Sequence, residues 1–232
     1  MADNPAVTPP PRAAATVLVV RRGAKGASVL MGQRGAEAAF MPSKYVFPGG
    51  AVDEDDASVI LARRLNDTCT ARIENGQAEV PGHALAAAAL RELWEETGLA
   101  LGRPGQTATL PAWEGFADTG VTPSAEGLRF FFRAITPPGR SRRFDARFFL
   151  ADAGALAGDP DDFGRASDEL SHLHWVPISE ARKLNLPFIT EVVLAELGAF
   201  LEGLTEDVPL PVPSSVPFFD NSGPIPTFRR IY

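Results

Sequence analysis

The segment RELWEETGL, residues 91–99, carries three glutamates close together near the middle of the chain. On a helix, at 100° per residue, Glu92, Glu95 and Glu96 fall within an arc of about 100°, and the apolar residues of the segment take the other side. A solvated acidic face is the ordinary interpretation of such a pattern. The segment therefore predicts a helix with three carboxylates on one face, and the neighbouring residues decide what that face does.

The neighbouring residues do not offset this charge. Glu92 and Glu96 form an i,i+4 like-charge pair, and alanines stand one turn to either side, at 88 and 100, where a basic residue would help. Gly98 predicts the left-handed end of the helix, so Glu95 and Glu96 lie in the last turn, where the helix dipole disfavours negative charge. A bound cation would reverse both penalties, and Mg²⁺ binds through oxygen ligands together with substrate phosphates. We therefore expect a divalent-cation site on this helix.

A glycine-containing loop lies upstream of the helix. The sequence FPGG, residues 47–50, is followed by the acidic run DEDD at 53–56. Adjacent glycines let a metal or a phosphate approach the backbone closely. Loop and helix together resemble the Nudix box, written Gly-x5-Glu-x7-Arg-Glu-U-x-Glu-Glu-x-Gly-U with U an aliphatic residue. Residues 91–99 match its second half at every fixed position, and FPGG is also typical of the Nudix hydrolase family.

The first half of the box departs from this pattern in two ways. Counted from Gly50, the expected glutamate is Asp56, and 34 residues rather than seven separate it from Arg91. We therefore expect an insertion of 27 residues, at 57–83, between the loop and the helix of the box. A similar insertion is found in a branch of Nudix hydrolases that includes the peroxisomal coenzyme A diphosphatases. Residues 40–42 (FMP) and 143–150 (RFDARFFL) resemble that branch as well.

The resemblance implies a fold and a chemistry. The fold is α/β, an α/β/α sandwich on a mixed sheet. The implied reaction is hydrolysis of the pyrophosphate bond in a nucleoside diphosphate derivative, with Mg²⁺ or Mn²⁺ as the cofactor. The branch favours coenzyme A or acyl-CoA as substrate, and ADP-ribose, NADH or another nucleotide derivative is the enzymatic alternative. An alternative of another class is a non-catalytic Nudix domain that senses a nucleotide.

The resemblance also implies site residues. The implied metal ligands are Glu92, Glu95, Glu96 and the Gly49 carbonyl. Arg91 is expected to orient the glutamates, and Glu96 is the first choice for the general base. Asp168 and Glu169, ahead of a predicted strand, are candidates for a further ligand or base, with ordinary loop charges as the alternative. Asp56 is expected behind the ligands, paired with Arg91.

Arginines are the candidates for binding the substrate phosphates. Six of them lie between positions 129 and 147, and a guanidinium binds phosphate through two parallel hydrogen bonds. The alternative is that they form surface ion pairs with the many carboxylates of the chain. We assign Arg34, Arg143 and Arg147 to the substrate.

Composition excludes several classes of function. The net charge of −7 disfavours nonspecific binding to nucleic acid. The single cysteine, Cys69, rules out an intrachain disulfide and fits a reducing compartment. No apolar run approaches the roughly 20 residues that span a bilayer, and residues 1–12 have no hydrophobic signal core. We expect a cytoplasmic protein that binds a small nucleotide, without a membrane or nucleic-acid partner.

The pattern along the chain predicts three parts. They are a flexible N-terminus at 1–12, a Nudix hydrolase domain at 13–205, and a proline-rich tail at 206–232 whose aromatic residues predict docking on the domain itself or on a second copy in a homodimer. Periodicity predicts strands at 13–20, 27–33, 45–47, 128–135, 144–150 and 173–177. It predicts helices at 58–65, 83–97, 178–184 and 187–204, and a loop at 152–168.

Overall fold

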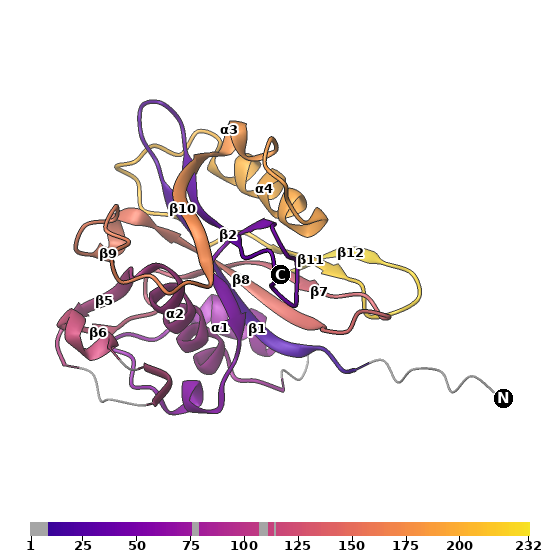
Figure 1. Ribbon diagram of the computed structural model, residues 1–232, viewed down its shortest axis with the longest axis horizontal. Helices are drawn as coiled ribbons and strands as arrows, with labels where there is room; N and C mark the ends of the chain where they lie inside the picture. Colours follow the sequence, from indigo (N-terminus) through magenta and orange to yellow (C-terminus); the bar gives the residue numbers. More distant parts are fainter. Residues whose placement is uncertain (1–8, 76–78, 107–110, 114) are drawn as a thin grey trace.

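A nine-stranded mixed sheet runs through the centre of the molecule (Figure 1). The computed structural model describes residues 9–75, 79–106, 111–113 and 115–232. The strands along the sheet follow the order β10 (Leu170–Pro177), β2 (Ser28–Arg34), β1 (Arg12–Arg21), β8 (Phe144–Asp152), β7 (Arg129–Ile135), β11 (Val216–Asp220) and β12 (Thr227–Ile231). Two short strands join its side, β3 (Tyr45–Val46) on β2 and β4 (Gly49–Ala51) on β1. The β1–β8 and β7–β11 pairs are parallel and the other pairs are antiparallel.

Helices cover both faces of the sheet. One face packs against α1 (Asp67–Glu74) and α2 (Gly82–Thr97), and the other against α3 (Ile178–Ala181) and α4 (Phe188–Leu201) (Figure 1). Strand β1 supplies both cores, because successive side chains of a strand point to opposite faces: Val17 and Val19 face α2, and Leu18 and Val20 face α4. The predicted α/β/α sandwich on a mixed sheet is confirmed.

A second, three-stranded sheet lies beside the first. Its order is β6 (Val121–Pro123), β5 (Ala100–Pro104) and β9 (Leu156–Ala157). Short 3-10 helices complete this side: η1 (Glu54–Ser58), η2 (Pro111–Trp113), η3 (Phe116–Thr119) and η4 (Ala153–Ala155). Phe116 contacts both Trp94 of α2 and Trp113 edge-on. The small sheet and its loops therefore cover the hydrophobic core that lies between α2 and the large sheet.

The segment between loop and helix differs from the predicted one. A helix was predicted at 58–65, and that prediction is wrong: α1 begins only at Asp67. The side chain of Asn66 accepts a hydrogen bond from the amide of Cys69 across 2.9 Å, which caps the helix start. Val59 and Leu65 are buried in the core on the α2 side of the sheet, although the segment that carries them is not helical. Tertiary packing therefore overrides the local helix propensity.

Other boundaries shift by a few residues. Helix α2 begins one residue before its predicted start, β10 begins three residues earlier at Leu170, and α3 and α4 each end three residues earlier than predicted. The region predicted as a loop at 152–168 contains η4 and β9. Within the part of the chain that the structure describes, the helices are all too short or too polar to cross a membrane.

Residues 9–12 and the C-terminal tail are both hydrogen-bonded to the rest of the domain. Residues 1–8 of the N-terminus predicted as flexible lie outside the described residues, and β1 already begins at Arg12. In the tail, β11 pairs with β7 and forms a hairpin with β12. The proline-rich stretch before β11 is bound through its backbone carbonyls, which accept hydrogen bonds from three arginines. Arg22 donates to Thr205 and Val208. Arg129 donates to Leu210, and Arg72 donates to Pro213 and Ser214. Carbonyl acceptors are what such a stretch can offer, because proline has no amide donor.

Candidate functional site

The three glutamates of α2 face strand β4 and the loop that leads into η1. The helix ends at Gly98, which has φ 75° and whose amide donates to the carbonyl of Trp94, so the last turn carries Glu95 and Glu96. Strand β4 pairs with β1 at Ala14, Ala15 and Thr16, which fixes the glycines of FPGG against the helix. Loop and helix are therefore adjacent because both pack on β1.

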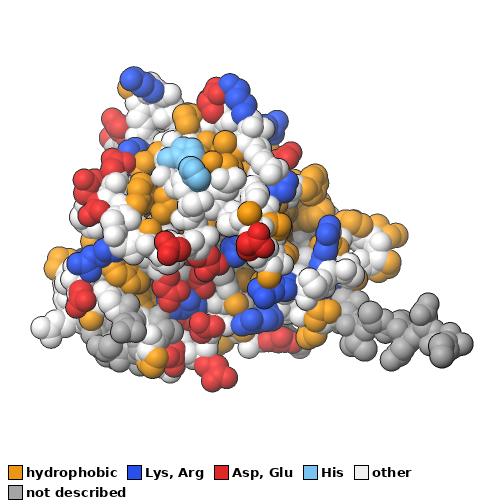
Figure 2. All heavy atoms as spheres, viewed as in Figure 1, with side chains coloured by type: hydrophobic (Ala, Val, Ile, Leu, Met, Phe, Trp, Pro, Cys, Tyr) orange, Lys and Arg blue, Asp and Glu red, His pale blue; other side chains and the backbone are white. Residues whose placement is uncertain are grey.

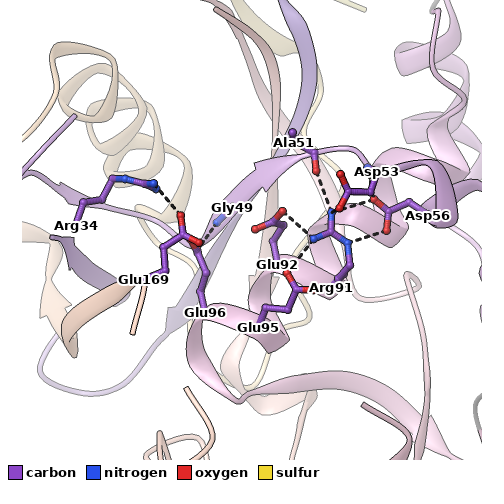
Figure 3. Close-up of polar contacts among 10 residues, drawn as sticks. All are labelled: Arg34, Gly49, Ala51, Asp53, Asp56, Arg91, Glu92, Glu95, Glu96 and Glu169. Atoms are coloured by element: carbon purple, nitrogen blue, oxygen red, sulfur yellow. Dashed lines mark hydrogen bonds and ion pairs between the residues drawn. The ribbon is translucent and has the colours of Figure 1, made fainter. Parts of the chain in front are cut away.

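Arg91 is the centre of a buried polar network (Figure 3). Its Nε and Nη2 donate to the two carboxylate oxygens of Asp56, each across 3.0 Å, and Nη2 also donates to the Ala51 carbonyl. Its Nη1 donates to Glu92 and to Glu95, each across 2.9 Å. Burial by itself would lower the pKa of Arg91, but the hydrogen bonds that Arg91 donates to Asp56 and the charges of the surrounding carboxylates hold the pKa above its ordinary value. The guanidinium thus stays charged and holds two of the three glutamates.

Glu96 is the most enclosed of the three glutamates. Its Oε2 accepts a hydrogen bond from the Gly49 amide across 2.7 Å, and its Oε1 is buried without a hydrogen-bond partner among the described residues. Burial and then the charge of Glu92 raise its pKa well above the ordinary value, against the bond from Gly49. The resemblance implied a role for the Gly49 carbonyl, whereas the contact that the structure shows uses the Gly49 amide.

Glu92 lies directly over Gly50. A Cβ atom at Gly50 would stand 2.4 Å from Oε1 of Glu92, so only glycine leaves room for this carboxylate. Burial raises the pKa of Glu92 to about 7, while Arg91 opposes the shift. Burial also raises the pKa of Glu95, which is half-exposed at the edge of the cluster. The absence of a side chain at Gly50 therefore makes the space that the Glu92 carboxylate occupies.

The loop before β10 brings a further carboxylate to the site. Glu169 ion-pairs with Arg34 of β2 across 2.8 Å, and its charge contributes to the raised pKa of both Glu92 and Glu96. Figure 3 shows Glu169 beside Glu96, with Arg34 and Arg91 on opposite sides of the carboxylates. The neighbouring Asp168 is exposed. Sequence position alone suggested Glu169 as a candidate, and β10–β2 pairing puts it beside the site.

The two arginines of β8 are held by other groups. Arg143 donates to the carbonyls of Thr136 and Pro9, and Arg147 ion-pairs with Asp145 across 2.8 Å. Strand β1 lies between Arg147 and Gly50, since Ala15 pairs with both. The structure places neither arginine among the carboxylates, so their assignment to substrate stays a prediction without support here.

Two contacts of the network were not predicted. The Ala51 carbonyl accepts from Arg91, and Asp53 ion-pairs with the same guanidinium across 3.7 Å. Every residue has a backbone carbonyl, so the amino-acid sequence does not indicate which carbonyl accepts a hydrogen bond. Asp53 belongs to the acidic run that the sequence did single out, but nothing in the run itself distinguishes Asp53 from its neighbours.

The donor chemistry of this cluster fits a hard divalent cation. Glu92, Glu95 and Glu96 supply oxygen ligands, and the partnerless Oε1 of Glu96 has crowded negative charge around it. Across the described residues, however, no three acidic, histidine or cysteine side chains are grouped closely enough to hold a metal as they stand. Arg91 draws Glu92 and Glu95 toward itself. Holding the cation would therefore require one of these two side chains to turn toward Glu96.

The sandwich, the glycine loop and the carboxylate-bearing helix define a Nudix-type α/β domain. Residues 10–197 match the family model of the NUDIX domain. This match covers most of the chain, and the chain therefore belongs to the NUDIX family.

Two relatives illustrate the similarity. The chain is 28% identical over 182 residues to a Caenorhabditis elegans protein named as nudix hydrolase 7, a match that covers 73% of this chain and 52% of that protein. The chain thus spans about half the length of this curated relative. The crystal structure of a NUDIX hydrolase from Alicyclobacillus acidocaldarius superimposes with a TM-score of 0.63 at 31% identity, covering 84% of this chain and 93% of that one.

Proposed function

We propose that this chain hydrolyses the pyrophosphate bond of a nucleoside diphosphate derivative, with coenzyme A or acyl-CoA as the substrate. The observation that carries the proposal is Glu96: a buried carboxylate, held by the Gly49 amide, with one oxygen partnerless and two further carboxylates around it. Membership of the NUDIX family supports the pyrophosphate chemistry. The separation of the two halves of the box, FMP at 40–42 and RFDARFFL at 143–150 support the coenzyme A substrate.

Glu96 is suited to accept a proton from the attacking water. Burial, and then the charge of Glu92, raise the pKa of Glu96 well above its ordinary value, which makes this carboxylate a stronger base than an exposed glutamate. The Gly49 amide fixes one oxygen, so the partnerless Oε1 is the one left to face the water. Water attacks one phosphorus, the bond from that phosphorus to the bridging oxygen breaks, and the other phosphate leaves with this oxygen. Glu96 accepts the proton that the water loses.

The remaining residues position groups and balance charge. Arg91 is fixed by the buried Asp56 and binds Glu92 and Glu95, so that either glutamate has only to turn from the guanidinium to reach a cation beside Glu96. Mg²⁺ or Mn²⁺, bound through Glu92, Glu95 and Glu96, would neutralise the phosphate charge and favour deprotonation of water. We assign Arg34 to a substrate phosphate, and its pairing with Glu169 and its charge acting on Glu96 support this assignment. Little covalent chemistry remains for the protein, as in phosphoryl transfer generally.

A substrate panel tests the proposal. The purified protein is incubated with Mg²⁺ or Mn²⁺ and coenzyme A, acetyl-CoA, ADP-ribose, NADH or nucleoside triphosphates, and the products are identified by mass. Adenosine 3',5'-bisphosphate from coenzyme A as the fastest product is the expected result. Faster cleavage of another member would keep the pyrophosphate chemistry and reject coenzyme A. Tight nucleotide binding without any cleavage would reject hydrolysis and favour the sensing alternative.

A further inference from the structure

Among the described arginines that pair with a carboxylate, Arg34 is the one whose Nε is buried without a hydrogen-bond partner. Nε and Nη2 of a guanidinium lie along one edge, and a carboxylate or phosphate that fits this edge accepts from both nitrogens. In four pairs among the described residues the carboxylate accepts from both nitrogens, at distances between 2.5 and 3.0 Å: Arg22–Asp152, Arg91–Asp56, Arg103–Glu126 and Arg133–Asp145.

In the Arg34–Glu169 pair only half of this edge is used. Nη2 of Arg34 donates to Oε1 of Glu169 across 2.8 Å. Nε of Arg34 is buried and has no hydrogen-bond partner among the described residues. A buried donor without an acceptor is costly, so this guanidinium has an unsatisfied donor on the edge that fits an oxyanion.

The side chain of Glu169 can leave without moving its backbone. The loop before it is fixed on α2, because the Ser167 amide donates to the Glu95 carbonyl across 3.0 Å and the Arg165 guanidinium lies over the Trp94 ring. Strand pairing fixes the residue after it, since Leu170 lies opposite Arg34 in the β10–β2 register. The Glu169 side chain itself is 53% exposed, against 18% for Arg34. Rotation of the carboxylate into solvent therefore disturbs no packed core.

Electrostatics also make this carboxylate replaceable. The Glu169 carboxylate lies beside that of Glu96 (Figure 3), and like charges placed so close repel each other. The ion pair with Arg34 offsets this repulsion. Because the Glu169 side chain is half-exposed, solvent weakens its single bond to Arg34. A doubly charged group with two acceptor oxygens is therefore a stronger partner for Arg34.

We propose that Arg34 is a phosphate-binding residue of the site and that Glu169 occupies it in exchange with a substrate phosphate. The phosphate accepts hydrogen bonds from both Nε and Nη2 of Arg34, and the Glu169 carboxylate leaves Arg34 and turns into solvent. Figure 2 shows acidic and basic side chains next to one another on one face of the molecule. The inference rests on the proposed function in that the ligand is a pyrophosphate group.

The test measures binding of methylenediphosphonate, a pyrophosphate analogue with a bridging carbon, by calorimetry in the presence of Mg²⁺. Because Glu169 competes with the phosphate for Arg34, Glu169→Gln should tighten binding by about three- to fivefold. Arg34→Gln should weaken it by about tenfold or more, since a charge-assisted pair of bonds is lost. The double variant should behave like Arg34→Gln, because the competitor has nothing left to compete for. Asp161→Asn, which removes the carboxylate of the exposed Arg21 pair, is the matched control and should change nothing.

Several results would overturn the exchange. If Glu169 were a metal ligand or merely held Arg34 in place, Glu169→Gln would weaken binding or leave it unchanged. The exchange would also be rejected if Glu169→Gln tightened binding of the analogue equally in the wild type and in Arg34→Gln, or if no variant bound the analogue. The readout needs no turnover, so failure of the substrate panel together with the expected binding pattern would remove the hydrolase proposal and leave the phosphate site. Turnover of the panel without this pattern would remove only the exchange.

Discussion

The amide nitrogen of Gly49 lies 2.7 Å from Oε2 of Glu96, although 47 residues separate the two in the sequence. The bond ties the start of β4 to the last turn of α2, and the other carboxylate oxygen has no hydrogen-bond partner among the described residues. Substitution of Glu96 by glutamine keeps an acceptor for the Gly49 amide and removes only the charge and the basicity.

We therefore expect Glu96→Gln to fold normally and to lose turnover by a factor of about 10² to 10⁴, the usual contribution of a general base. The measurement is kcat on the best substrate of the panel, with the melting temperature as the check on folding. Glu191→Gln, at an exposed position in the first turn of α4, is the control and should retain full activity. Near-normal turnover in Glu96→Gln would show that another group accepts the proton.

Arg91→Met should strongly destabilise the protein. Asp56 is fully buried and is held by two bonds from Arg91, so the substitution leaves a buried carboxylate without its partner. Breaking such a pair costs about 3–5 kcal/mol of unfolding free energy, measured by urea denaturation.

Arg103→Met is the matched control for this prediction. Arg103 binds Glu126 with the same two nitrogens, but both side chains are exposed, so the expected loss is below about 1 kcal/mol. Similar losses in the two variants would contradict the view that burial sets the difference.

Without a divalent cation, Glu92 should make stability fall as pH rises. Its pKa is about 7 in the folded protein against an ordinary 4.5, so between these values the folded state holds more protons than the unfolded state. The free energy of unfolding then decreases with rising pH. The penalty is complete above pH 7 and amounts to at most about 3 kcal/mol.

The variant Glu92→Gln isolates this effect. In the presence of EDTA it should gain stability relative to the wild type by about 1–3 kcal/mol between pH 5 and pH 8, measured by urea denaturation at both values. Adding Mg²⁺ at pH 8 should stabilise the wild type more than the variant. A stability difference that does not change with pH would show that Glu92 titrates normally.

The two glycines of the loop should respond differently to alanine. In Gly50→Ala the new Cβ meets the carboxylate of Glu92 at 2.4–2.6 Å, and a side chain can move aside. We expect a folded protein with weakened Mg²⁺ affinity and reduced turnover.

In Gly49→Ala the Cβ meets the backbone of Ala15 and Thr16 at 2.5 and 2.6 Å. Because the backbone cannot yield cheaply, this variant should lose about 1–3 kcal/mol of stability or more. Thermal unfolding and Mg²⁺ titration separate the two effects, and equal loss of stability in both would contradict this distinction.

Much of the fold follows from local pattern. The alternating and apolar runs of β1, β2, β7 and β8 and the two long helices were predicted within a few residues, because each carries a strong period of its own. The helix at 58–65 was wrong, since Val59 and Leu65 are fixed by the core rather than by propensity. Strands β11 and β12 were not predicted, because prolines weaken the strand signal and only pairing with β7 reveals it.

The sequence by itself determined the three carboxylates on one helical face, the glycine before them and the end of the helix at Gly98, since these depend only on helix geometry and on backbone freedom. Only the tertiary structure decided which of these carboxylates is buried against Gly49, which are drawn to Arg91, and which outside residues join them. Arg34 and Glu169 come together across β2 and β10, whereas Arg143 and Arg147 are held elsewhere. Such contacts depend on strand register and loop packing between residues far apart in the chain, and no local period records them.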